Sequence, residues 1–137
     1  MVRVRRQDWP LRLNAWLDSV RERPFAWGVN DCALGAADAV LAMTGVDYAA
    51  EFRGAYFSKR NAARLLAERG GLERLVTQAL GDPLATPKLS QRGDVVLVHA
   101  GAGGPALAVV LGAHAVAPGP GGAVFVPMAQ WLMAWRV

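Results

Sequence analysis

Residues 24–40, "PFAWGVNDCALGAADAV", mark the point where a turn-rich loop gives way to a helix. Pro24 closes the preceding helix, and Asn30 or Asp31 can cap the next one by accepting hydrogen bonds from free backbone N–H groups. The inward positions expected for this helix, which runs up to Gly45, are Leu34, Ala37, Val40 and Leu41. Cys32, the only cysteine of the chain, falls in the first turn. Two roles suit a cysteine placed there: a reactive nucleophile, or a small apolar filler between helix and sheet.

Helices are also predicted on either side of this stretch. Asp8 and Pro10 favour a helix start, and an apolar stripe continues to about residue 22. Ser58 can cap a third helix that ends before Gly70, and a fourth follows at once and ends at Gly81. The expected inward residues of these helices are Leu13, Trp16, Leu17 and Val20, then Ala62, Leu65 and Leu66, then Leu72, Leu75, Val76, Ala79 and Leu80.

The apolar pattern changes its period after a polar, proline-bearing linker at residues 81–92. The stretches "GDVVLVHA" (93–100) and "ALAVVLG" (106–112) are short, continuous, valine-rich runs joined by "GAGGP". Runs of this kind are typical of paired central strands that are buried on both faces.

A second strand pair is predicted around residues 114–117 and 123–126, followed by one helical turn and a last strand. The helical half, about residues 8–80, therefore precedes a sheet half, residues 93–137. This order predicts one α+β domain over residues 1–137, with N-terminal helices packed on a C-terminal antiparallel sheet.

Composition narrows the classes of partner. The 137 residues are 53% hydrophobic and carry a formal charge of +4, which suits one compact domain with a fairly apolar surface. Only Arg3, Arg5 and Arg6 cluster, without the interleaved aromatic residues of a nucleic-acid surface, so no nucleic-acid partner is expected. The start lacks the apolar run of a signal peptide, and no stretch reaches the about 18 apolar residues of a membrane span.

Three stretches resemble the NlpC-type branch of the papain-like cysteine peptidases: "FAWGVNDCALGAADAV", "RGDVVLVHAG" and "PALAVVLG". The "WG-x-x-DC" start and the "AWRV" end more closely resemble small phage and prophage proteins of this fold that are encoded among tail genes. The resemblance implies a papain-like fold with Cys32 at the nucleophile position. It also implies a lowered cysteine pKa, because free N–H groups and the dipole of the helix favour the thiolate.

The histidine that such an enzyme requires is missing from its usual place. In the family a histidine begins the second central strand, and Ala106 takes that position here. The polar residue that orients the imidazole would fall near Ala117 and Pro118, neither of which can do so. Of the two histidines present, His114 is expected in an exposed turn, whereas His99 ends the first central strand. If the hairpin closes there, His99 and Ala106 face each other across the strands, and a displaced His99 could act as the base.

The remaining candidates concern binding. Asp31 is expected to cap its helix, and Trp27, beside the cysteine, is a candidate to line a groove together with Asp31. Trp131 and Trp135 are candidates for the groove or for a contact with another subunit. No metal or cofactor is expected, because the histidines, cysteine and carboxylates lack ligand spacing and the glycine-rich turns lack a phosphate-binding lysine.

Two classes of function remain open at this stage. The first is a structural component of a phage or phage-like tail tip or baseplate, made in the bacterial cytoplasm without a signal peptide and built into the virion beside other tail proteins. The second is a peptidoglycan peptide hydrolase with Cys32 as nucleophile and His99 or a partner's residue as base. A domain that binds peptidoglycan peptides without cutting them is a third reading.

Overall fold

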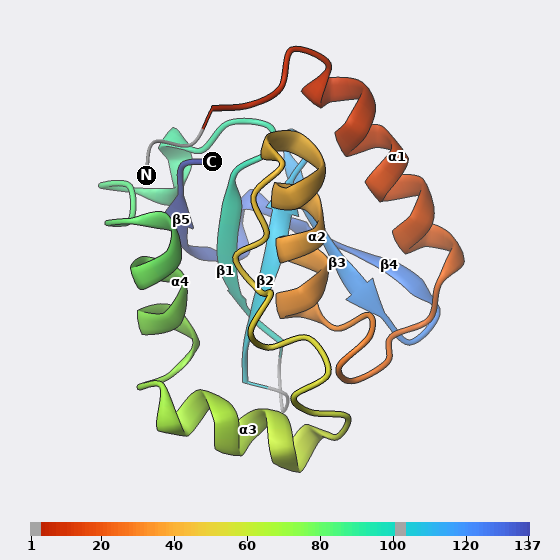
Figure 1. The fold of residues 1–137 in the computed structure, drawn as a ribbon. Helices are drawn as coiled ribbons and strands as arrows, with labels where there is room; N and C mark the ends of the chain where they lie inside the picture. The colour runs from red at the N-terminus through yellow and green to blue at the C-terminus, as the bar shows by residue number, and fades with distance from the viewer. Residues whose placement is uncertain (1–3, 101–103) are drawn as a thin grey trace.

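The computed structural model describes residues 4–100 and 104–137, and its architecture is α+β (Figure 1). Within these residues four α-helices come first and one antiparallel sheet of five strands follows. The helices are α1 (Trp9–Glu22), α2 (Cys32–Thr44), α3 (Lys59–Glu68) and α4 (Leu72–Leu80). The strands are β1 (Val95–His99), β2 (Pro105–Val110), β3 (His114–Gly119), β4 (Gly122–Pro127) and β5 (Trp131–Trp135), with short 3-10 turns η1 (Pro87–Leu89) and η3 (Met128–Gln130). The predicted class and element order are confirmed.

Two predictions lie outside the described residues: Arg3 of the basic cluster and residues 101–103 of the "GAGGP" turn. One helix-face prediction is wrong, since Leu41 is 37% exposed on the outer face of α2. No helix in the described part of the chain is long and apolar enough to cross a bilayer.

The sheet has the strand order β4-β3-β2-β1-β5. In the central pair, Leu97 lies opposite Leu107 and Val98 lies opposite Ala106. Leu97 and Leu107 pack with the helices in the main core, whereas Val98 and its neighbours on the other face pack in a second cluster with Trp131. Burial on both faces explains why these strands are continuous apolar runs rather than alternating ones.

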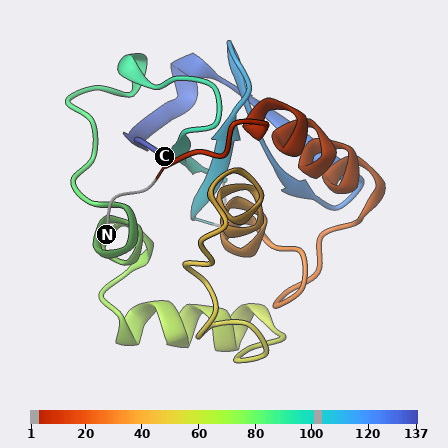
Figure 2. The same cartoon turned by 45° about the horizontal axis from the view of Figure 1, so that its top comes forward.

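Helix α2 lies at the centre of the helical layer. It packs against α1 and over β2 and β3, and Figure 2 shows it nearly end-on, with α1 and α4 on opposite sides of it and α3 running across below. Its approach to the sheet depends on Gly35, because a Cβ atom there would lie 2.8 Å from the Pro118 ring. Any larger residue would push the start of α2, and with it Cys32, away from β3.

A buried carboxylate ties the two ends of the described chain together. Asp94, which precedes β1 and is fully buried, forms ion pairs with Arg5 at 3.0 Å and Arg136 at 3.3 Å. It also accepts hydrogen bonds from the backbone N–H groups of Gln91 and Val137. The segment before α1, the start of β1 and the residues after β5 are therefore held at one point.

Candidate functional site

The loop that leads into α2 is organised by the carboxylate of Asp31, which is only 2% exposed. One oxygen accepts a hydrogen bond from the Leu34 N–H at 2.9 Å and so caps the helix. The other accepts from the Gly28 N–H at 2.9 Å and from the Tyr56 hydroxyl at 2.5 Å. Asp31 thus joins the loop, the helix and the connection between α2 and α3, which is a structural task.

The glycine of the "WG-x-x-DC" motif has an equally clear structural reason. Gly28 adopts a φ of 77°, in the left-handed region that favours glycine. A Cβ atom there would lie 1.9 Å from the backbone oxygen of Tyr56. The loop can pass this close to Tyr56 only without a side chain, and that closeness lets one Asp31 oxygen reach both donors.

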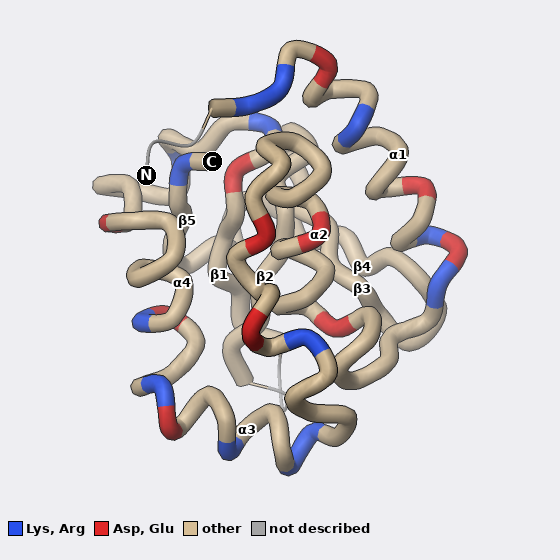
Figure 3. The backbone as a smooth tube through the Cα atoms, viewed as in Figure 1, with Lys and Arg blue, Asp and Glu red and all other residues tan. Residues whose placement is uncertain are grey.

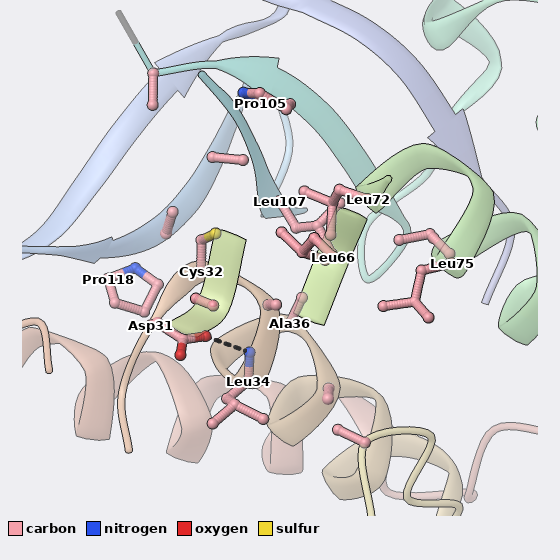
Figure 4. A pocket seen from close by; sticks show the side chains of 18 of the residues that line it. Asp31, Cys32, Leu34, Ala36, Leu66, Leu72, Leu75, Pro105, Leu107 and Pro118 are labelled. Carbon is pink, nitrogen blue, oxygen red and sulfur yellow. Dashed lines mark hydrogen bonds between the residues drawn. The ribbon is translucent and has the colours of Figure 1, made fainter. Parts of the chain in front are cut away.

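Cys32 is the first residue of α2, and its sulfur points into a cavity of about 890 Å³ (Figure 4). The walls come from α2, α3, α4, the connection at residues 46–57 and the sheet, and most of the lining side chains are apolar. Representative lining residues are Ala36, Leu66, Leu72, Leu75, Leu107 and Pro118. The cysteine therefore keeps some exposure, but to an apolar hollow rather than to a polar cleft.

A cavity of this size cannot be both sealed and empty. At about 24 cal/mol per Å³, a sealed and empty void of this volume would cost roughly 20 kcal/mol. That exceeds the total stability of about 5–15 kcal/mol typical of a domain. The cavity is therefore not a sealed void but opens to the surface, and its apolar lining favours an apolar occupant.

The surroundings of Cys32 keep its thiol protonated. Burial raises the pKa of Cys32 above its ordinary value, and the nearby charge of Asp31 raises the pKa further, while hydrogen bonding with the Leu107 backbone opposes both effects. The lowered pKa implied by the resemblance is therefore wrong, because burial, with the charge of Asp31, outweighs the hydrogen bonds from the backbone N–H groups of Leu107, Ala33 and Cys32. Burial, and after it the bond to Asp31, also raises the pKa of the Tyr56 hydroxyl.

The positions that the resemblance gives to an active site are only partly brought together. Pro118 lies against the start of α2 at Gly35, whereas Ala106 and Ala117 line the same large cavity but pack with Val98 and Trp131 on the other face of the sheet. None of the three carries a group that can accept a proton. These three positions therefore supply no acid–base group to the cavity.

His99 lies at the end of β1 and also lines this cavity, but the pairing expected for it is wrong. Its partner across the hairpin is Pro105, whereas Ala106 is paired with Val98. Adjacent strand residues point to opposite faces, so His99 and Ala106 do not face each other. No side-chain hydrogen bond or ion pair of His99 is found among residues 4–100 and 104–137, so no such bond there holds the ring against the Cys32 sulfur.

The other candidates divide between cavity and core. Trp27 is half-buried, lines the cavity and packs edge-to-face against Phe25. Trp131 and Trp135 are 5% and 0% exposed, so the prediction that they line a groove or contact another subunit is wrong. Both fill the core, and their indole N–H groups bond to the Val126 carbonyl and the Thr77 hydroxyl. His114 is exposed as expected, although it begins β3 rather than lying in a turn.

A sequence profile of a family described as a domain of unknown function (DUF6950) matches residues 4–137. The chain belongs to the DUF6950 family. The match covers both the helical half and the sheet, so the cavity between them lies within the DUF6950 domain. Comparison with curated proteins gives no match.

Two residues of this DUF6950 site escaped the sequence reasoning. Tyr56 and Lys59 both line the cavity, at the end of the aromatic-rich connection and at the start of α3. Neither belongs to a periodic pattern or a motif, so only the tertiary contacts identify them. In the described ranges no group of three or more histidine, cysteine, aspartate or glutamate residues could hold a metal ion.

Proposed function

We propose that this chain is a non-catalytic structural component of a phage or phage-like tail tip or baseplate, built on a papain-like, NlpC-type fold. The observation that carries the proposal is the environment of Cys32. A protonated thiol, an alanine at the histidine position and a mostly apolar cavity, in which no described residue holds the His99 ring against the sulfur, argue against an activated nucleophile.

The arrangement of the helical layer and the sheet supports the papain-like part of this proposal. In that fold a helix begins with the cysteine and packs against an antiparallel sheet whose central strands supply the remaining site positions. Here α2 begins with Cys32 and packs on β2 and β3, and Pro118 of β3 lies against the start of α2 at Gly35. The contact between Pro118 and the start of α2 is the part of this arrangement that supports the likeness.

The surface supports a role in assembly. Val124 and Phe125 on β4 are each 45% exposed, and Leu132 on β5 is 55% exposed. These strands are the two edges of the sheet, where a partner could pair with or pack against them. Tail proteins are the partners proposed for these edges, with the virion as the place of assembly.

The test uses phage-like particles assembled with an epitope-tagged copy of this chain. We expect the tag in purified tails, at the tip or baseplate by immunogold labelling, and the same labelling for a Cys32→Ser variant. By contrast, Phe125→Glu should reduce the amount of the chain built into tails, because it places a charge on an exposed apolar edge of the sheet. Tails without the tag would contradict the proposal.

The second candidate is a peptidoglycan peptide hydrolase, and it is favoured by one observation: Cys32 and His99 line the same cavity. A hydrolase would release peptides from purified cell wall, and both Cys32→Ala and His99→Ala would abolish the release. Because the lining offers few polar partners to the carboxylates and amides of such peptides, we expect no release from the wild-type chain. A base supplied by a partner chain would show as release only when purified tails are added.

A further inference from the structure

We propose that the cavity beside Cys32 binds the hydrocarbon chain of a single-chain anionic amphiphile, a fatty acid. This site is independent of the role in tail assembly. It rests on the cavity's volume, on its lining and on the charges at its edge, and none of these depends on whether the domain ever acted on peptides.

The shape and lining of the cavity select the apolar part of the ligand. Its volume, about 890 Å³, lies within the range of about 300–1,000 Å³ typical of small-molecule sites. Leucine and alanine side chains of α2, α3 and α4 face one another across it, for example Ala36, Leu66 and Leu75 (Figure 4). A hydrocarbon chain has no polar group to satisfy there, whereas a peptide would bury amide groups without partners.

The charged residues at the cavity select the head group. Asp31 is already bonded to three donors, and Glu51 is paired with Arg69. Lys59, the first residue of α3, lines the cavity, and its ammonium group has no hydrogen bond or ion pair with any other described residue. Figure 3 shows basic positions along α3. A carboxylate at this end of the cavity would meet an unpaired ammonium group.

The first experiment uses laurate with the wild-type chain. Native mass spectrometry should show a single adduct, and laurate should displace the fluorescent probe anilinonaphthalene sulfonate in a saturable way. Since Cys32 is the only cysteine, its alkylation by iodoacetamide at mildly alkaline pH reports on the cavity alone. Bound laurate should slow that alkylation. Absence of a saturable adduct, or an adduct that leaves alkylation unchanged, would overturn the proposal.

Matched variants locate the site. Ala79 on α4 lines the cavity, whereas Ala67 on α3 is exposed and does not. Ala79→Leu should weaken laurate binding by about tenfold or more, because added methylenes occupy the space of the chain. Ala67→Leu should leave it unchanged. Equal effects of the two substitutions would overturn the assignment, and circular dichroism checks that both variants are folded.

A third variant tests the head group. Lys59→Gln should weaken laurate binding about two- to fivefold, as expected for an exposed ion pair, and should leave dodecanol binding unchanged. An equal effect on the acid and the alcohol would overturn the assignment of an anionic ligand. Since the alkylation of wild-type Cys32 is measured separately, the proposal stays testable even if a variant fails to fold.

Discussion

Replacing Asp31 with alanine should destabilise the domain by about 3–5 kcal/mol. The carboxylate is 2% exposed and accepts three hydrogen bonds, from Leu34, Gly28 and Tyr56. Removing it leaves a buried phenol and two backbone N–H groups without their acceptor and removes the cap of α2, which alone is worth about 1 kcal/mol. Because such a domain is stable by only about 5–15 kcal/mol, the loss should be plain in a urea unfolding curve.

Matched variants separate this effect from a general loss of charge. Asp38, on the same helix, forms an exposed pair with Arg53, so Asp38→Ala should cost no more than about 1 kcal/mol. Tyr56→Phe should cost about 1–2 kcal/mol, and a double-mutant cycle with Asp31→Asn should give a coupling energy of similar size. A cost below about 1 kcal/mol for Asp31→Ala, or a coupling energy near zero, would refute the reasoning.

Three further predictions concern the same domain. Gly28→Ala should destabilise the domain far more than Gly54→Ala, and equilibrium unfolding measures the difference. Both glycines have a φ of 77°, but only at Gly28 would an added Cβ atom lie 1.9 Å from a backbone oxygen. The free energy of unfolding should fall above about pH 8.5, the ordinary thiol pKa. The reason is that the Cys32 thiol ionises in the unfolded chain, whereas in the folded chain its raised pKa keeps it protonated. Cys32→Ala should therefore flatten the fall of the unfolding free energy with pH. An unchanged fall in this variant would contradict the raised pKa of Cys32. Asp94→Ala should cost about 3–5 kcal/mol, since it leaves Arg5 part-buried without its carboxylate, and rapid amide hydrogen exchange near both ends of the chain should accompany the loss.

Local patterns predicted the secondary structure well, and the physical reasons are visible. The stripe Leu13, Trp16 and Val20 is buried in α1 because its spacing matches one helix face. The valine-rich runs formed the central strands because burial on both faces selects uninterrupted apolar residues. Leu41 fitted the same helix spacing but lies at the edge of the stripe, where the neighbouring elements leave it exposed.

The site was less predictable because its properties depend on neighbours distant in the sequence. The position of Cys32 at a helix start suggested an activated thiolate, yet burial and Asp31 give the thiol a raised pKa. The tryptophans near the end of the chain looked like surface anchors, but Trp135 is fully buried. Composition alone does not reveal which apolar residue lies in the core and which at an edge.

The sequence by itself determined the α+β order and the helix that begins at Cys32, since these follow from local spacing and residue type. Only the tertiary structure decided what surrounds the cysteine. It brought Tyr56 to Asp31, paired His99 with Pro105, and set α3 and α4 around an apolar cavity. Desolvation, strand register and cavity volume arise from contacts between distant segments, so they appear only once the chain is folded.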